Sequence, residues 1–339
     1  MPEYLRHARA QTLSRFEDLR DKLSDAEALI AGKACVYATG SFGRLEAGPF
    51  SDLDLFIVSE TEKKEKNGTN ILVHRLNGID EIRLKYYLVQ AVDDCGIAPF
   101  DGSGKYLEVH GIGDFASKLG EREDDYHNTL TGRLLLLLES RQLLGRQTYD
   151  SLLDNVIAAY FRDFEANEAE FIPAFLVNDI LRMWRTFAVN YELERRKPGK
   201  GFRIKNLKLK YSRMITCYSA VMYLLAQHIR ANTVTPANVR AMVALTPSER
   251  LERVGSDAAI PDKQEAARFA SLIANVIADY SAFLELTHRE KKEIEAEFDD
   301  KFAEWRMNSY DFGRKFAETL TILGQSGNLF DGLYRIILI

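Results

Sequence analysis

The sequence predicts an α+β fold, in which a small mixed-sheet domain is followed by a larger all-helical domain. Short apolar runs that end at glycine or turn residues, as buried strands do, occur within residues 33–118. From residue 119 to 339 the apolar residues recur at helical spacing, and Pro or Gly residues separate successive segments. A chain of 339 residues is long enough for two such domains.

Residues 1–32 are predicted to form an N-terminal helix ahead of the sheet. Leu13, Phe16 and Leu19 recur at helical spacing among charged residues, and Gly32 is a suitable C-terminal stop. In the sheet domain, strands are predicted at 34–38, 53–58, 71–76 and 106–112, and residues 82–92 fit a strand or a helix. In the helical domain, helices are predicted at 133–144, 149–167, 175–196, 207–228, 237–245, 262–286 and 290–323. The apolar residues 334–339 either dock into the core or form a subunit contact.

The composition excludes several classes of protein. An apolar fraction of 46% and a charged fraction of 28% exclude a disordered or collagen-like chain. The apolar run 134–138 is too short to span a bilayer and the N-terminus is charged, so we expect no membrane segment and no secretory signal. Three separated cysteines indicate reduced thiols in a cytoplasmic protein. The net charge of −5 argues against coating of nucleic acid but leaves room for a local basic groove.

The stretch that carries chemistry is residues 39–58. In the run Asp52-Leu53-Asp54-Leu55, period-2 alternation places both carboxylates on one face of a strand and both leucines on the other. Two close carboxylates on a mostly buried strand repel each other and lose hydration. A divalent cation removes that conflict, and Mg²⁺, or Mn²⁺ in its place, is the ion we expect.

Gly40 and Ser41 lie just upstream, where the first strand ends and a short helix is predicted to begin. A glycine there lets the backbone approach a ligand closely, and a serine offers its hydroxyl and backbone N–H groups to phosphate oxygens. The sequence therefore predicts a triphosphate between Ser41 and metal ions held by Asp52 and Asp54.

This stretch resembles the signature of the polymerase-β-like nucleotidyltransferase superfamily, with Gly40-Ser41, ten intervening residues, and Asp-Leu-Asp-Leu at 52–55. The fuller strings at 40–46 and 49–55 are most similar to the bacterial protein uridylyltransferase and adenylyltransferase branch, which modifies nitrogen-regulatory proteins. The resemblance implies that residues 33–118 form a catalytic domain. It also implies transfer of a nucleoside monophosphate (NMP) from a nucleoside triphosphate (NTP) to an acceptor hydroxyl, with release of pyrophosphate.

The superfamily has a third carboxylate on a later neighbouring strand, and the resemblance implies that Glu108 takes this place. It would complete the metal shell or accept the hydroxyl proton, and Asp101 and Asp80 are its rivals. Arg44 either contacts phosphate or pairs with Glu46, and the sequence leaves both readings open.

Residues 182–213 are strongly basic, with eleven Lys and Arg and two Glu, a local charge of +9 that leaves −14 on the rest of the chain. Arg182 and Arg185 share a helix face at i, i+3 spacing, and Lys205 and Lys208 repeat it. The resemblance implies that basic residues of the helical domain bind the nucleotide phosphates. We expect Lys208, with Arg182 and Arg185, to do so. The alternative is a solvated face that balances an acidic protein.

The acceptor has three candidates. A protein side chain follows from the most similar branch, and an RNA 3′ end follows from the basic segment. A second nucleotide would make the enzyme a second-messenger synthase. A different class of function is a non-catalytic regulatory or toxin–antitoxin binding protein that retains the fold. The hydrolase and regulatory domains of the family's larger members do not fit in this chain, which favours a stand-alone transferase. No residue pattern specifies the base of the nucleotide or the oligomeric state.

Overall fold

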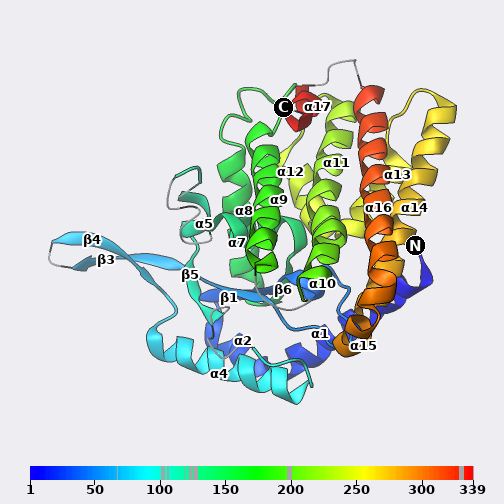
Figure 1. The fold of residues 1–339 in the computed structure, drawn as a ribbon. Coiled ribbons are helices and arrows are strands. Elements are labelled where there is room, and N and C mark those ends of the chain that lie inside the picture. The colour runs from blue at the N-terminus through cyan, green and yellow to red at the C-terminus, as the bar shows by residue number, and fades with distance from the viewer. Residues whose placement is uncertain are drawn as a thin grey trace. The chain divides into compact units, whose positions relative to one another are not determined.

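The computed structural model describes residues 1–66, 68–100, 104, 107–117, 119–121, 124, 129–196, 201–327 and 332–338. These residues form an α+β fold with a small mixed sheet in the N-terminal part and helices after it, which confirms the predicted class (Figure 1). The chain divides into two compact units. The first is His7–Ala159, and the second combines Met1–Arg6 with Tyr160–Ile339. This division falls at a different place from the expected domain boundary at 118, and each unit is described by itself.

The first unit is built on a four-stranded sheet with the strand order β5-β2-β1-β6. Its strands are β1 (Ala34–Ala38), β2 (Leu55–Ser59), β5 (Val109–Gly111) and β6 (Arg141–Leu144). β1 pairs antiparallel with β2 and with β6, and β2 pairs parallel with β5. Because Ala38 lies opposite Leu55, the end of β1 and the start of β2 meet at the same edge of the sheet.

Both faces of this sheet are covered. On one face, Val36 and Ile57 belong to a core that includes residues of α1 (Glu3–Lys22), α2 (Ser24–Ile30) and α4 (Gly78–Asp94). On the other face, Tyr37 stacks on Phe56 with ring centroids 5.4 Å apart and meets Tyr149 of α8 (Arg146–Tyr160) at 6.0 Å. A strand buried on both faces is apolar along its whole length, which is why β1 was predictable at its observed bounds.

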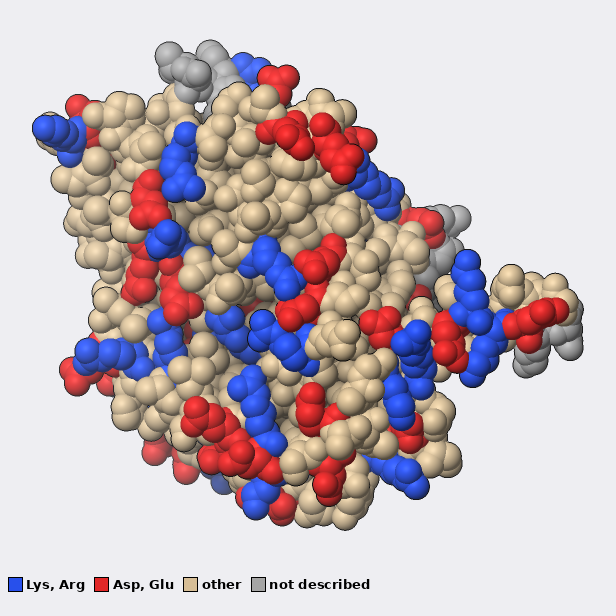
Figure 2. Space-filling view, turned by 180° about the vertical axis from the view of Figure 1, so that it is seen from behind, with Lys and Arg blue, Asp and Glu red and all other residues tan. Residues whose placement is uncertain are grey.

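A separate hairpin of β3 (Thr61–Lys66) and β4 (Thr69–His74) extends away from the four-stranded sheet of this unit (Figure 1). The strand predicted at 71–76 corresponds to β4, but β3 was not predicted. Its sequence consists of one Thr followed by Glu and Lys residues and contains no apolar residue, so its pairing rests on backbone hydrogen bonds to β4. Basic and acidic side chains lie next to each other along the projecting hairpin in Figure 2.

The ambiguous residues 82–92 belong to the helix α4. Its N-cap is Asn77, whose Oδ1 accepts hydrogen bonds of 3.0 Å from the backbone N–H groups of Ile79 and Asp80. The Asn77-Gly78 pair, which also fits a hairpin turn, therefore starts a helix here.

The helix predicted at 133–144 is wrong in its second half. The helix α7 (Thr129–Glu139) ends first, and Arg141–Leu144 forms the edge strand β6. The five consecutive leucines at 134–138 extend the helical pattern toward the strand, whereas the strand depends on pairing with β1, which is distant in the sequence. The expectation that strands are absent after residue 119 is wrong for the same reason.

The second unit is helical in the residues described. Its helices are α9 (Ala174–Arg195), α10 (Gly201–Lys208), the π-helix η2 (Leu209–Arg213), α11 (Met214–Ala231), α12 (Pro236–Ala244), α13 (Pro247–Asp257), α14 (Lys263–Thr287), α15 (Lys291–Ala296), α16 (Phe298–Ser326) and α17 (Gly332–Leu338). The predicted helix 207–228 is thus interrupted by a π-helical turn. The apolar C-terminal residues lie in α17 as far as the structure describes them.

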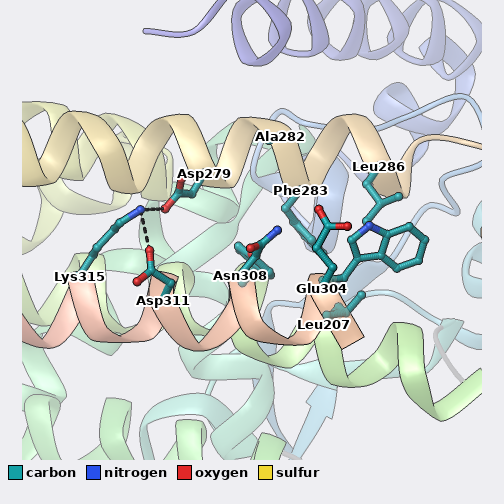
Figure 3. Close-up of a pocket in the computed structure, with 11 residues that line it drawn as sticks. Leu207, Asp279, Ala282, Phe283, Leu286, Glu304, Asn308, Asp311 and Lys315 are labelled. Atoms are coloured by element: carbon teal, nitrogen blue, oxygen red, sulfur yellow. Dashed lines mark hydrogen bonds and ion pairs between the residues drawn. The ribbon is translucent and has the colours of Figure 1, made fainter. Parts of the chain in front are cut away.

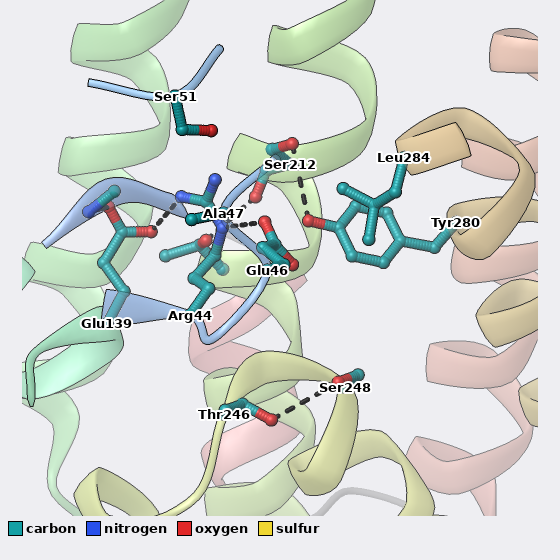
Figure 4. A network of polar contacts seen from close by, with 12 residues as sticks. Arg44, Glu46, Ala47, Ser51, Glu139, Ser212, Thr246, Ser248, Tyr280 and Leu284 are labelled. Carbon is teal, nitrogen blue, oxygen red and sulfur yellow. Dashed lines mark hydrogen bonds and ion pairs between the residues drawn. The ribbon is translucent and has the colours of Figure 1, made fainter. Parts of the chain in front are cut away.

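The helix α13 was not predicted, because a proline such as Pro247 also fits a break between two helices. Proline is favoured in the first turn of a helix, where its missing N–H costs nothing. Thr246 and Glu249 form a capping box around it, and Thr246 also contacts Ser248 (Figure 4).

One described helix, α14, is long and apolar enough by length and composition to cross a membrane. A single such helix is weak evidence, because core helices pass the same test. α14 packs against α13 and α16 within the second unit, and its buried residues include Phe269, Ile273 and Tyr280. We therefore describe it as a helix of the bundle.

Candidate active site

The Gly40-Ser41 turn follows β1 directly and forms the single helical turn α3 (Gly40–Gly43). The backbone N–H of Thr39 donates to the carbonyl oxygen of Asp54 at 2.8 Å, which ties this turn to the segment before β2. Gly40 has φ of +64°, and a Cβ at this position would lie 2.6 Å from Oδ2 of Asp54. The glycine that was expected to make room for a ligand therefore makes room for the Asp54 carboxylate.

Asp52 and Asp54 come immediately before β2, at the edge of the sheet where β1 ends. Leu53 and Leu55 are buried, whereas Asp52 is exposed and Asp54 is half-buried. This burial pattern follows the alternation that the sequence predicted. Asp52 also forms an isolated parallel bridge with Ala98, so its backbone is held on the side away from β1.

Side chains of α1 hold the loop that leads to Asp52. The Thr12 hydroxyl accepts a 2.9 Å hydrogen bond from the backbone N–H of Ala47, and Arg15 Nη1 donates to the carbonyl of Gly48 at 2.9 Å. Within the loop, the N–H of Gly48 donates to the Ser51 hydroxyl at 2.9 Å. Burial lowers the pKa of Arg15. These contacts fix the backbone just before the aspartate pair.

Arg44 is occupied by two carboxylates. Its Nε pairs with Glu46, and its Nη1 donates to Oε2 of Glu139 at 2.7 Å (Figure 4). The Arg44 side chain is only 8% exposed, and both glutamates are buried. Of the two readings that the sequence leaves open, the structure shows the pairing with Glu46 and adds Glu139, whereas phosphate binding by Arg44 stays a prediction.

Glu139 was not recognised from the sequence. It ends α7, and its Oε1 accepts a 3.2 Å hydrogen bond from the backbone N–H of Gly40. The backbones are also close, since a Cβ on Gly43 would lie 1.8 Å from the carbonyl oxygen of Glu139. The available signal was a carboxylate directly after five leucines, where a buried charge needs a partner.

Leu45, between the two members of the Arg44–Glu46 pair, adopts a left-handed conformation with φ of +57°. This is unfavourable for a bulky residue and costs on the order of 1–3 kcal/mol. The turn is closed by the N–H of Glu46, which donates to the carbonyl of Ser41 at 2.8 Å. Strained backbone of this kind is often found at functional sites.

The candidates for a third carboxylate lie in different places. Glu108 is exposed and precedes β5, which begins at Val109, so the expected mid-strand position is wrong. Because β5 runs parallel to β2, Glu108 is nevertheless on the side where β2 begins. Asp80 is at the opposite end of the sheet, since it pairs at 2.8 Å with Lys33, which precedes β1. Asp101 lies outside the described residues.

The two aspartates supply ligands that suit Mg²⁺. This ion takes carboxylate oxygens and completes its shell with waters and substrate phosphates. Among the residues that the structure describes, no group of three or more His, Cys, Asp or Glu side chains is arranged to hold a metal. Asp52 and Asp54 therefore fit an ion shared with a nucleotide, and the third ligand stays a prediction.

The basic residues predicted to bind phosphate belong to the second unit. Arg182 lies 3.6 Å from Asp179, and Lys210 and Arg213 lie over aromatic rings. Arg185 on α9 and Lys208 on α10 are exposed. Part of the basic segment is thus engaged within its own unit, and the phosphate-binding role of the three predicted residues stays a prediction.

Part of the first unit matches a family model. Residues 17–133 match the family model of the nucleotidyltransferase domain. The matched segment includes the Gly40-Ser41 turn and both aspartates, and it ends in α7 before Glu139. This confirms a nucleotidyltransferase domain of the polymerase-β-like superfamily, whereas the uridylyltransferase and adenylyltransferase branch stays a prediction. A comparison with curated proteins finds no match.

Proposed function

We propose that this protein is a metal-dependent transferase that moves an NMP from an NTP to an acceptor hydroxyl and releases pyrophosphate. The observation that carries the proposal is the junction of the Gly40-Ser41 turn with the Asp52–Asp54 segment inside the nucleotidyltransferase domain. A phosphate-binding turn and a carboxylate pair at one sheet edge are the parts that such a transfer needs.

In the proposed reaction, the acceptor oxygen bonds to the α-phosphorus as the bond from that phosphorus to the oxygen bridging to the β-phosphate breaks. Asp52 and Asp54 would hold Mg²⁺, which when bound neutralises charge on the triphosphate. Ser41 would contact the β- and γ-phosphates, and Glu108 would accept the proton of the acceptor hydroxyl. Catalysis would come mainly from positioning and electrostatics, since no covalent intermediate with the protein is needed.

Lys208, Arg182 and Arg185 would stabilise the negative charge that grows on the pyrophosphate. Their charge and the exposure of Arg185 and Lys208 support this role, which otherwise rests on the resemblance.

The acceptor is proposed to be protein or RNA. Similarity of residues 40–55 to the protein-modifying branch supports a protein, and the local charge of +9 supports RNA. A second nucleotide as acceptor, or nucleotide binding without turnover, remains an alternative outcome of the test below.

The test uses each NTP in turn, radiolabelled at the α-phosphate, with purified protein, Mg²⁺ and a cell extract treated or not treated with nuclease. Products are resolved into protein, RNA and small molecules. The wild type is compared with the double variant Asp52→Asn/Asp54→Asn. The control Asp93→Asn/Asp94→Asn removes the same charge from two exposed residues at the end of α4.

We expect label in one fraction with the wild type and the control, and none with Asp52→Asn/Asp54→Asn. The labelled fraction identifies the acceptor class. Full labelling by the site variant would overturn the assignment of the aspartates. Nucleotide binding without any labelled product would favour the non-catalytic binding protein.

A further inference from the structure

The second unit contains a pocket of about 410 Å³ between α14 and α16, with Leu207 of α10 and Tyr211 of the π-helix η2 also in its wall (Figure 3). This volume lies within the range of roughly 300–1,000 Å³ that is typical of small-molecule sites. Residues 17–133, which match the nucleotidyltransferase domain, contribute none of its lining residues.

One part of the wall is aromatic. Tyr211, Phe283 and Trp305 line the pocket. The rings of Tyr211 and Phe283 stack with centroids 4.4 Å apart and an interplanar angle of 8°, which makes a rigid surface. Aromatic faces attract cations through the ring quadrupole as well as apolar groups through burial.

The charged part of the wall is acidic. Asp279, Glu304 and Asp311 line the pocket, and the ammonium of Lys315 lies 2.7 Å from Asp279 and 3.0 Å from Asp311, away from Glu304 (Figure 3). Asp311 is also paired with Arg314, which lies outside the lining, so the three carboxylates exceed the two cations beside them by one negative charge. Glu304 makes no ion pair or hydrogen bond within the described part of the chain, so its carboxylate is available.

Tyr211 gives independent support for a ligand. Its side chain is buried, with the residue only 6% exposed, and its hydroxyl has no hydrogen-bond partner among the residues described. Burial, together with the nearby carboxylates of Asp279 and Asp311, raises the pKa of this phenol, so it stays neutral and can both donate and accept. The hydroxyl oxygen is not among the fully enclosed polar atoms that lack a partner, so it reaches the pocket, where a ligand would replace water as its partner.

The backbone at this place is also unusual. Tyr211 lies on η2, a π-helical turn between α10 and α11. Such turns are rare and are frequently found at functional sites, because the widened turn changes the direction of a side chain. Here the turn places a phenol in the wall of the pocket.

We propose that this pocket binds a small organic cation, namely a primary amine or a guanidinium carried on an apolar body. Glu304 would hold the cationic group, the Tyr211 hydroxyl would accept a hydrogen bond from one of its N–H groups, and Trp305 would cover the apolar body. An anion is disfavoured by the excess negative charge. A neutral apolar molecule would desolvate Glu304 and leave Tyr211 without a partner, at a cost in free energy.

Isothermal titration of the full-length protein tests this proposal with two cationic probes, tyramine and agmatine. N-acetyltyramine is the matched uncharged probe, since it keeps the ring and loses the ammonium. The variants are Glu304→Gln, which removes a charge without breaking an ion pair, and Tyr211→Phe, which removes only the hydroxyl. Asp300→Asn is the control, because Asp300 is an exposed carboxylate one turn earlier on α16 and lies outside the pocket.

A second readout locates the bound probe. The chain has two tryptophans, and in a Trp184→Phe background the remaining one, Trp305, lines the pocket. We expect agmatine to change the fluorescence of Trp305 over the same concentration range in which calorimetry detects its binding. Agmatine is used here because it does not absorb or emit in the tryptophan range.

We expect at least one amine to bind and N-acetyltyramine to bind much more weakly than tyramine. Glu304→Gln and Tyr211→Phe should weaken binding about fivefold or more, and Asp300→Asn should leave it unchanged. The proposal is overturned if neither amine binds at millimolar concentration. It is also overturned if the neutral probe binds as tightly as tyramine, or if Glu304→Gln binds like the wild type.

Discussion

At Gly40 the left-handed backbone and the absence of a side chain together make room for the Asp54 carboxylate. The left-handed φ of +64° disfavours any other residue, and the Asp54 carboxylate occupies the place where a side chain would begin. The same residue donates its N–H to Glu139. One glycine therefore positions a proposed metal ligand and connects the turn to the Arg44 ion pairs.

We predict that Gly40→Ala loses transfer activity and more than about 2 kcal/mol of stability. The left-handed conformation costs about 1–2 kcal/mol, and the new Cβ would push the Asp54 carboxylate away. Gly32→Ala is the matched control, because Gly32 has φ of +66° with nothing within 4 Å of its Cβ position. Urea unfolding and the labelling assay measure both variants. If Gly32→Ala loses as much of both properties as Gly40→Ala, contact with Asp54 is not the cause.

A second prediction concerns Glu139. Glu139→Gln keeps an oxygen for the Gly40 N–H but leaves the buried Arg44 with one carboxylate fewer, so we expect a loss of about 3 kcal/mol in urea unfolding. Glu81→Gln breaks a partly exposed i, i+4 pair with Lys85 and should cost less than about 1 kcal/mol. Equal small losses in the two variants would show that the Arg44 pairs contribute little.

At the scale of elements, α7 is anchored by a fully buried ion pair. Arg133 of α7 donates to both carboxylate oxygens of Asp124, at 2.9 and 2.6 Å, and to the carbonyl of Phe115 in α5 (Asp114–Ser117) at 3.1 Å. Burial alone would raise the pKa of Asp124. Hydrogen bonds from Arg133 and Thr129 outweigh it and hold the pKa below its ordinary value.

This pair predicts a pH-dependent stability. Because the folded-state pKa of Asp124 is below the unfolded value of about 3.9, its stabilisation is present above that pH and is lost as the pH falls through the folded pKa. Asp124→Asn should therefore be less stable than the wild type by about 3 kcal/mol at neutral pH, and the difference should shrink in acid. Urea unfolding over a pH series measures this. A difference that stays constant down to acid pH would contradict it.

Some elements were predictable because their signal is local. β1 and α9 carry continuous apolar or helical patterns, and the structure has them within a residue or two of the expected bounds. β3 and β6 were missed because their pairing partners, rather than their own composition, decide their conformation. The π-helical turn at 209–213 was not predictable either, because the helical spacing of the apolar residues continues on both sides of it.

In the candidate site, too, the residues with a local sequence signal were predicted and those that depend on distant partners were not. The motif residues Gly40, Asp52 and Asp54 were found because the residue types and the spacing together are specific. Arg44 was left open, and Glu139 was missed, because their pairing joins residues far apart in the chain. Glu108 was expected in the middle of a strand, but it lies one residue before β5 begins. The start of this short strand depends on its register with β2, which the sequence does not show.

At the scale of the whole molecule, the three cysteines differ in burial. Cys35 in the first unit and Cys217 in the second are buried, whereas Cys95 is half-buried. Burial raises the pKa of both Cys35 and Cys95, which lowers their thiolate fraction, but a reagent can still reach Cys95 because it is only half-buried.

We predict that one thiol of the native protein reacts with a disulfide reagent and that all three react in denaturant. Cys95→Ser should abolish the native reaction. In partial denaturant, the rates of Cys35 and Cys217, measured by mass spectrometry, show whether the two units unfold together. Reaction of two or more thiols under native conditions would contradict the burial described here.

The membership of Met1–Arg6 in the second unit has a practical consequence for dissecting the chain. The Tyr4 hydroxyl is hydrogen-bonded to Nδ1 of His288 at 2.8 Å, and the amino group of Met1 lies 3.7 Å from the Glu252 carboxylate. A fragment that begins at Tyr160 would lack both contacts. An expression plan for that unit alone should therefore graft the first six residues back or supply them as a peptide, and any fusion tag is better placed away from Met1.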